Sequence, residues 1–236
     1  MKKFTEASSS ELKTMLRELQ GRYDAFCAQN LKLNMARGKP APSQLDLSAP
    51  LMDKMNTYTL EDGTDARNYG ILEGIPECRR LFGETLGIAP DQIIIGGNSS
   101  LNVMFDTLSF LCLFGTHGSM PWHYHKYSGH PVKFLCPVPG YDRHFKICEE
   151  LGIEMIPVPL LDDGPDIEMV KKLAGEDPYI KGIWCVPLHS NPQGVCYSDP
   201  VVEQLASMET AAEDFRIFWD NAYGIHHIYE EVPLKN

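Results

Sequence analysis

The sequence lacks any apolar run long enough to cross a lipid bilayer, and its first ten residues, MKKFTEASSS, lack the apolar core of a secretory signal. Positive charge is also scarce: 21 Lys and Arg residues stand against 32 Asp and Glu residues, which gives a formal net charge of -11. A surface of that sign repels phosphate backbones and anionic lipids. We therefore expect a cytoplasmic protein with neither nucleic acid nor membrane as a partner.

Disulfide and metal motifs are missing as well. The seven cysteines form no CxxC pair and stand mostly in apolar surroundings, which predicts buried, reduced thiols. Four histidines gather in the segment THGSMPWHYHKYSGH, at His117, His123, His125 and His130, but their spacing fits no standard zinc site. We interpret this segment as a surface insertion and predict no metal.

The apolar content, 43% of 236 residues, is sufficient for one large domain, or for one domain and a small lobe. Ser8 and Glu11 have the spacing of a capping box, and apolar residues recur every three or four positions after them, which predicts a helix over 10–29. The next stretch, LNMARGKPAPSQLDLSAPLM, is rich in Pro, Gly and Ser and predicts an extended arm.

Apolar runs of strand length then alternate with helical patterns. The predicted strands are 93–96, 132–138, 154–159, 182–187 and 215–220, and the predicted helices are 100–114, 141–151, 166–173 and 200–212. Strands that are apolar throughout and alternate with helices indicate a mostly parallel sheet covered on both faces. The predicted fold class is therefore a three-layer α/β/α domain, in which ligands bind at the carboxyl ends of the strands.

The first predicted strand ends in a small polar turn, Asn98, Ser99 and Ser100, directly before a helix. Free backbone N–H groups, hydroxyls and the helix dipole suit a phosphate there, although the turn is neither GxGxxG nor a Walker loop. A glycine turn with a serine N-cap explains the same residues without a ligand. The turn alone does not decide between the two interpretations.

Two other strand ends carry polar residues. Tyr141 and His144 follow the second strand, where the ring could stack on a flat ligand and the histidine could orient an acid. Asn191 follows the fourth strand, and Pro192, in trans or in cis, would fix the direction of its amide. Each of these also fits an ordinary structural role, such as a helix start or a proline turn.

Asp220 ends the fifth predicted strand and is followed closely by Tyr223. A carboxylate at the end of a buried strand is costly unless it faces a cation, a metal or several donors, although an N-cap role is also possible. Taken together, the strand ends suit a flat ligand with a phosphate, a ring oxygen and a basic ring nitrogen. Pyridoxal 5'-phosphate has all four features.

The chain resembles the fold-type I pyridoxal-phosphate aminotransferases, most closely the bacterial aspartate aminotransferase subgroup. The resemblance lies in five segments in the family's order: RNYGILEGIPECRRLFGETLGI, GGNSSLNVMFD, CPVPGYDRHF, HSNPQGVCYSD and WDNAYG. It implies that 1–60 is an N-terminal helix and arm belonging to a small domain, and that 61–236 is the cofactor-binding large domain. The implied reaction transfers the amino group of an acidic amino acid, such as L-aspartate, to 2-oxoglutarate.

The resemblance also implies a role for each matched residue. Asn98, Ser99 and Ser100 would hold the phosphate, and Tyr141 would stack on the pyridine ring. Asn191 and Tyr223 would bond the ring oxygen, Asp220 would pair with the ring nitrogen and stabilise a quinonoid, and His144 would support Asp220. Tyr69 would reach the phosphate of a partner subunit, which implies a homodimer, and Gly38 and Asn191 would line the substrate site.

Two family residues have no counterpart among these 236: the Schiff-base lysine, usually within Ser-x-x-Lys, and the arginine for the substrate carboxylate. The Ser10 to Lys13 match lies in the predicted capping pattern, and Lys126, Lys133 and Lys146 match no family motif. The chain is therefore expected to be a truncated large domain that is inactive by itself. A related lyase, a ligand-sensing domain and a non-catalytic remnant remain alternatives on the same scaffold.

Overall fold

The computed structural model describes residues 3–32, 40–54, 56–227 and 230–235, and the chain divides into two units, Met1–Tyr58 and Thr59–Asn236. The first unit contains η1 (Phe4–Glu6), α1 (Ser9–Ala28), α2 (Pro42–Leu45) and η2 (Ala49–Lys54). The predicted capping box is confirmed, because Ser8 Oγ accepts from the Glu11 amide and the Glu11 carboxylate accepts from the Ser8 amide. Within the described residues, no helix is both long and apolar enough to cross a membrane.

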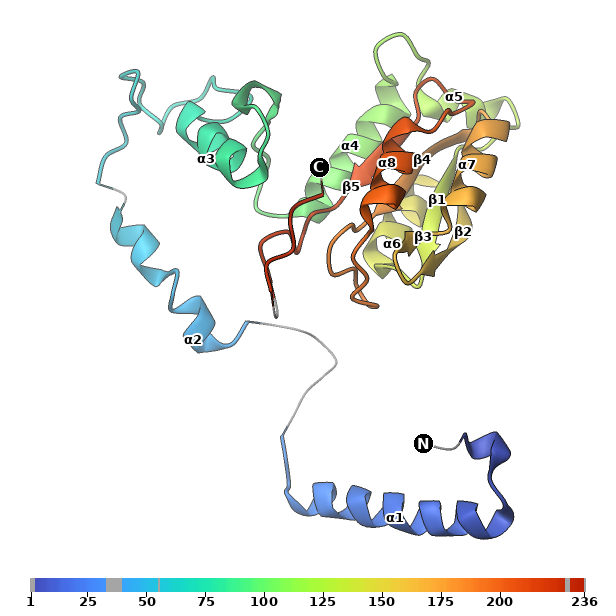
Figure 1. The fold of residues 1–236 in the computed structure, drawn as a ribbon. Helices are drawn as coiled ribbons and strands as arrows, with labels where there is room; N and C mark the ends of the chain where they lie inside the picture. The colour runs from blue at the N-terminus through green and yellow to red at the C-terminus, as the bar shows by residue number, and fades with distance from the viewer. Residues whose placement is uncertain (1–2, 33–39, 55, 228–229, 236) are drawn as a thin grey trace. The chain divides into compact units, whose positions relative to one another are not determined.

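The second unit is built on a five-stranded sheet in the order β3-β2-β1-β4-β5 (Figure 1). The strands are β1 (Lys133–Val138), β2 (Glu154–Leu161), β3 (Gly164–Pro165), β4 (Ile180–Cys185) and β5 (Arg216–Trp219). All neighbouring pairs are parallel except β2 with the two-residue β3. The predicted α/β class with a mostly parallel sheet is therefore confirmed.

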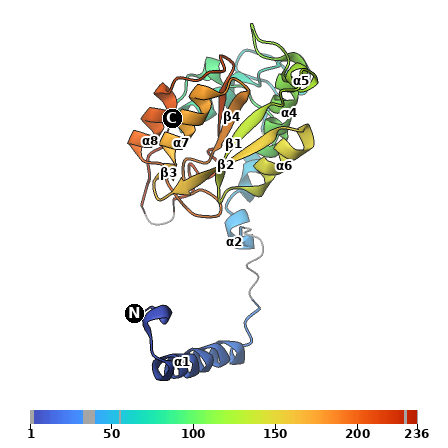
Figure 2. The ribbon, with the colours of Figure 1, turned by 90° about the vertical axis from the view of Figure 1, so that its right-hand side faces the viewer.

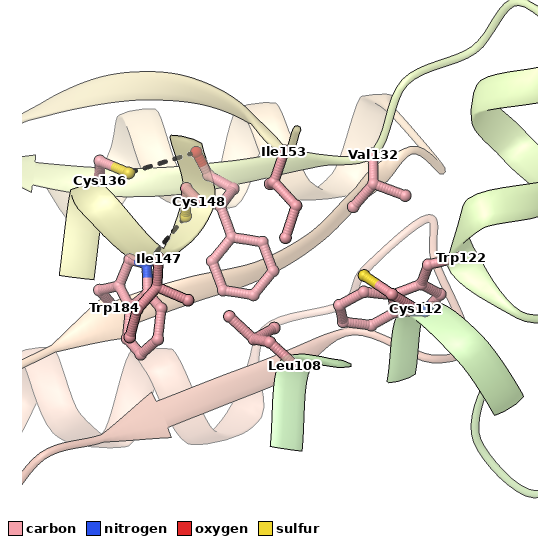
Figure 3. Packing of buried hydrophobic residues seen from close by; sticks show 10 residues of the cluster. Leu108, Cys112, Trp122, Val132, Cys136, Ile147, Cys148, Ile153 and Trp184 are labelled. Carbon is pink, nitrogen blue, oxygen red and sulfur yellow. Dashed lines mark hydrogen bonds between the residues drawn. The ribbon is translucent and has the colours of Figure 1, made fainter. Parts of the chain in front are cut away.

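Helices cover both faces of this sheet (Figure 2). Side chains alternate along each strand, so Phe134 and Trp184 join the core under α4 (Ser100–Phe114), α5 (Trp122–Tyr127) and α6 (Asp142–Leu151), part of which is drawn in Figure 3. Leu135 and Ile183 point the other way, into the core under α7 (Ile167–Glu176) and α8 (Asp199–Ser207). The three-layer arrangement follows from these two separate cores.

The segment before α4 holds a helix that the periodicity did not predict. It is α3 (Pro76–Leu86), which begins with a proline and ends at Gly87 in the left-handed conformation, φ 67°. The short η3 (Pro90–Gln92) follows and contacts α3. The predicted strand 93–96 is wrong: these residues are irregular, Ile94 is 75% exposed, and the Ile95 amide bonds the Glu73 carbonyl instead of a strand. A strand needs a neighbour, and within the described chain these residues have none.

The segment with four histidines lies mostly at the surface, as predicted, but it is not only an insertion. Its second half contains α5, and Trp122 at the start of α5 is 1% exposed, with its indole Nε1 donating to Asp214 Oδ2 at 2.8 Å. His125 and His130 pack against Tyr179, with ring centroids 5.6 and 4.5 Å away. Trp122 therefore contributes to the core, and two of the four histidines make aromatic contacts.

Most other boundaries agree to within a few residues. Helix α4 begins and ends where predicted, and α6, α7 and β2 lie within three residues of their predicted bounds. The helix predicted over 200–212 stops at Ser207, because Met208 adopts an extended backbone with ψ 142°. The fourth strand begins two residues earlier and ends two residues earlier than predicted, so that Val186 and Pro187 lie beyond it.

Gly182 is required by the packing of the sheet. It pairs with Arg216 across β4 and β5, and a Cβ there would overlap the Phe134 ring and lie 2.7 Å from the Arg216 carbonyl oxygen. We expect Gly182→Ala to lower the free energy of unfolding by about 1–3 kcal/mol, measured by urea denaturation of the complete gene product. Gly175→Ala in α7 is the control, because its Cβ would meet nothing closer than 3.8 Å. Equal stability of the two variants would contradict the argument.

Candidate active site

The carboxyl ends of three adjacent strands bring the main candidate residues to one edge of the sheet. Tyr141 lies at the start of α6 after β1, Asn191 follows β4, and Asp220 directly follows β5. The Asp220 amide still donates to the Cys185 carbonyl at 2.8 Å, so the residue is held by the last ladder bond between β4 and β5. This is the edge at which a parallel sheet binds its ligands.

Asp220 and His144 form the centre of this site. His144 Nε2 lies 3.0 Å from Asp220 Oδ2, and the two side chains are 2% and 9% exposed. The other carboxylate oxygen, Oδ1, accepts from the Ala222 amide at 3.1 Å. Within the described part of the chain, no lysine or arginine pairs with Asp220. A nearly buried carboxylate is thus held in place without a permanent cation beside it.

His144 is enclosed by two aromatic rings. The Trp184 indole stacks on the imidazole, with centroids 4.5 Å apart and planes 9° from parallel, and Tyr141 meets it edge to face at 5.1 Å and 86°. The indole Nε1 in turn donates to Cys148 Sγ at 3.3 Å (Figure 3). Sequence reasoning missed Trp184, because a tryptophan within a buried strand gives no signal beyond core packing.

Tyr141, His144 and Asn191 line the same hollow, together with Trp184, Ser190 and Tyr197. The hollow has a volume of about 20 Å³, room for little more than one water molecule. Ligand pockets are usually about 300–1,000 Å³. The hollow in the described chain is therefore much smaller than an ordinary ligand pocket.

The turn that carries Asn191 is closed by its own hydrogen bonds. The Ser190 amide donates to the Val195 carbonyl at 2.9 Å, and the Val195 amide donates to Ser190 Oγ at 3.0 Å. The Asn191–Pro192 peptide bond is cis, the second of the two forms considered from the sequence. The half-buried Asn191 thus projects from a closed loop beside Tyr141 and His144.

The polar turn before α4 shows its N-cap role directly. Ser99 Oγ accepts from the Asn102 amide at 3.4 Å and donates to Asn102 Oδ1 at 3.2 Å. Asn98 and Ser100 are exposed. Capping and anion binding use the same free amides at a helix start, so the cap leaves the phosphate role a prediction.

Two predicted residues are not brought into this cluster, and a third cannot be placed. Tyr223 is half-buried and lies near the His226 ring, 6.5 Å between centroids, but does not line the hollow. Tyr69 is 98% exposed. Gly38 lies outside the described residues. Their roles stay predictions.

The thiols are mostly buried, as predicted. Cys112, Cys136, Cys148 and Cys185 are buried and all seven cysteines are free. Burial raises the pKa of Cys112 to about 11 and that of Cys185 to about 12, so both stay protonated near neutral pH. No group of three or more His, Cys, Asp or Glu side chains is arranged to hold a metal ion in the described ranges.

A buried ion pair lies at the opposite end of the sheet, and the sequence did not reveal it. Lys181 Nζ lies 2.6 Å from Asp214 Oδ1, with side chains 8% and 5% exposed. Burial raises the pKa of Asp214, but the hydrogen bonds from Lys181 and Trp122 outweigh it, so that the pKa is lowered overall. A lysine within an otherwise apolar strand was the available signal.

Comparison with known proteins identifies the family of this chain. The family model described as "Aspartate amino-transferase" matches residues 7–236. An aspartate aminotransferase of Corynebacterium glutamicum is 44% identical over 219 residues, which cover 92% of this chain and 50% of that protein. A Mycolicibacterium smegmatis protein, named provisionally as an aminotransferase, is 50% identical over 221 residues, 91% of this chain and 50% of its own. The chain therefore spans about half the length of the curated relatives it matches.

Solved structures give the same result. The crystal structure of an aspartate transaminase from Corynebacterium glutamicum has a TM-score of 0.83 and 42% identity, covering 93% of this chain and 51% of that one. An α-aminoadipate aminotransferase from Thermus thermophilus, complexed with N-(5'-phosphopyridoxyl)-L-leucine, shares the fold at a TM-score of 0.52 and 20% identity, over 72% of this chain and 39% of its own. With a family model that matches almost the whole chain and a relative half identical to it, the chain belongs to the aspartate aminotransferase family.

Proposed function

We propose that this chain forms the cofactor-binding part of a pyridoxal-phosphate-dependent aminotransferase that uses L-aspartate as amino donor and 2-oxoglutarate as acceptor. The observation that carries the proposal is Asp220: its carboxylate is 9% exposed, is fixed by His144 and Ala222, and has no lysine or arginine partner in the described chain. Such a carboxylate suits a ligand that brings its own cation, and a protonated pyridine nitrogen is one. The relatives' names support the substrate.

The chemical types of the candidate residues suit pyridoxal phosphate. Asp220 would hold the proton on the ring nitrogen, and Tyr141 would cover one face of the ring. Asn191 and Tyr223 would donate to the ring oxygen. The turn of Asn98, Ser99 and Ser100 would bind the phosphate at the start of α4, where the dipole favours an anion.

The cofactor would supply an electron sink for the substrate's α-carbon. The chain's own contribution is to hold and orient. His144 keeps Asp220 Oδ2 directed along one hydrogen bond, and the Ala222 amide fixes Oδ1, so the carboxylate needs no reorientation when the ligand binds. Asn191, on its closed turn, would orient the ring oxygen and the substrate, and Gly38 would line the substrate side.

Two of the lysines considered from the sequence are engaged in ion pairs. Lys133 pairs with Asp177 at 2.8 Å, and Lys146 pairs with Glu149 and Glu150 at 2.9 and 2.8 Å on the surface. We therefore propose that these 236 residues do not transaminate alone. We also propose a homodimer, in which the exposed Tyr69 would reach the partner's phosphate site.

The complete gene product provides the test. We expect it to bind pyridoxal phosphate and to convert aspartate and 2-oxoglutarate to oxaloacetate and glutamate, while the 236-residue chain forms no product. Absence of cofactor binding would refute the reaction class. Turnover of another amino acid in preference to aspartate would refute only the substrate assignment, and activity of the 236-residue chain would refute the statement about the lysine.

A further inference from the structure

The surroundings of His144 include one residue to which neither the comparisons nor the expected cofactor contacts assign a role. Trp184, the last residue but one of β4, is 2% exposed and stacks on the imidazole at 4.5 Å with nearly parallel planes. A parallel stack at this distance leaves the imidazole no room to turn about its Cβ–Cγ bond. The plane of His144 is therefore set by the indole.

The indole is itself fixed by the helix that carries His144. Cys148 lies one turn after His144 on α6, and positions four apart lie on the same helix face. The Trp184 Nε1–H donates to Cys148 Sγ at 3.3 Å while its ring covers His144. Cys148 is fully buried. Hydrogen bonds from Cys136 and Trp184 lower its pKa, although burial acts in the opposite direction. A lowered pKa is expected for a thiol sulfur that accepts hydrogen bonds.

The two contacts together bridge β4 to α6 at two points. One is the face of the ring on His144, and the other is the indole N–H on Cys148, so the indole can neither slide nor tilt without breaking one of them. Tyr141 closes the edge of the imidazole, and only Nε2 remains directed toward Asp220. The direction of the His144–Asp220 hydrogen bond is thus determined by a residue that lies in the core.

We propose that Trp184 is a positioning residue, which orients His144 and through it Asp220 toward the ring nitrogen of the cofactor. The part concerning the cofactor rests on the proposed function, whereas the orientation of His144 does not. Trp184 acts through another residue and touches no reacting atom. An ordinary core role would predict only a loss of stability on substitution.

The first measurement uses the complete gene product without cofactor, so that it is independent of the proposed function. Side-chain 15N NMR of its histidines is expected to show one tautomer of His144 in the wild type, because Nε2 is held against Asp220. Trp184→Leu, which removes the flat face, is expected to mix the two tautomers. Trp184→Phe, which keeps a flat aromatic ring against the imidazole, should retain a single tautomer. Phe134→Leu is the control, because Phe134 packs on Trp184 at 5.6 Å in the same core.

The second measurement is the Kd for pyridoxal phosphate by absorbance titration. We expect Trp184→Leu to weaken binding about tenfold, since the loss of a residue that supports a binding group typically costs about that factor. The Kd values of Trp184→Phe and Phe134→Leu should stay within about threefold of the wild type. If Trp184→Leu does not fold, Cys148→Ala replaces it, and the expected result is a mixed His144 tautomer and about threefold weaker binding.

An unchanged His144 spectrum in Trp184→Leu, or in Cys148→Ala if that variant is used, would overturn the proposal. An equal change in Phe134→Leu would also overturn it, by showing that any loss of core volume has the same effect. If the wild type binds no pyridoxal phosphate, the proposed function fails, and the NMR comparison still decides whether Trp184 orients His144.

Discussion

Replacing Asp220 by asparagine in the complete gene product is expected to lower the transamination rate by about a thousandfold while leaving part of the cofactor affinity. A carboxylate about 4 Å from a pyridinium, at an effective dielectric near 20, contributes about 4 kcal/mol, which raises the nitrogen's pKa by roughly three units. The amide of asparagine is neutral and cannot do this. It can still accept the hydrogen bond from His144, so the surrounding structure should persist.

The measurement is kcat, together with the cofactor content of the purified variant. Asp142→Asn is the matched control: its carboxylate lies in the first turn of α6 and is 78% exposed, so its loss should change kcat by less than about twofold. Near-wild-type turnover in Asp220→Asn would refute the pairing of Asp220 with the ring nitrogen. A comparable loss in both variants would point to a general effect of charge.

The second large effect concerns stability. Asp214→Ala is expected to lower the free energy of unfolding by about 3–5 kcal/mol, because it leaves the buried ammonium of Lys181 without its carboxylate. The Trp122 indole loses its acceptor at the same time. Urea denaturation of the complete gene product measures this change, and loss of soluble expression would be its extreme form.

A second ion pair in the same part of the sheet provides the comparison. Lys133 and Asp177 lie 2.8 Å apart but are 26% and 28% exposed, so Asp177→Ala should cost about 1 kcal/mol or less. The double change Lys181→Met with Asp214→Leu should recover most of the loss, since it removes both charges. Equal effects of Asp214→Ala and Asp177→Ala would contradict the role given to burial.

The pH dependence of this pair has a definite sign. The folded-state pKa of Asp214 lies below its ordinary value of 3.8, so its contribution to stability is complete above that value and is lost as the pH falls through the folded pKa. The wild type should therefore lose stability steeply below about pH 4, and Asp214→Ala should lose less over the same range. An equal slope in both would show that other carboxylates control acid unfolding.

The parts of the fold that could be predicted are those encoded by local sequence. Helix α4 was placed correctly because Ser99 caps its start and Gly115 follows its end, and β1 was placed because its residues are apolar after Lys133. The strand predicted over 93–96 failed because a strand depends on a neighbour, and the described chain provides none there. Apolar character marks burial but does not identify the partner.

In the candidate site as well, the residues could be named from the sequence, but the contacts between them could not. Their positions at strand ends made Tyr141, His144, Asn191 and Asp220 candidates, and the family resemblance gave each of them an expected role. The distances between them, such as 3.0 Å from His144 to Asp220, depend on contacts across 76 positions. The stack of Trp184 on His144 and the pair of Lys181 with Asp214 join residues far apart in the sequence, and no local pattern encodes them.

The buried ion pair and the proposed active site occupy opposite ends of the same strands. Asp214 precedes β5 and Asp220 follows it, so about 20 Å of extended backbone separates the two carboxylates. Effects of substitutions that far apart are generally additive. In genetic terms, alleles that lower the amount of folded protein should map to one end of the sheet, and alleles that abolish activity at a normal amount of protein should map to the other. An allele of one class should not restore the function lost through an allele of the other.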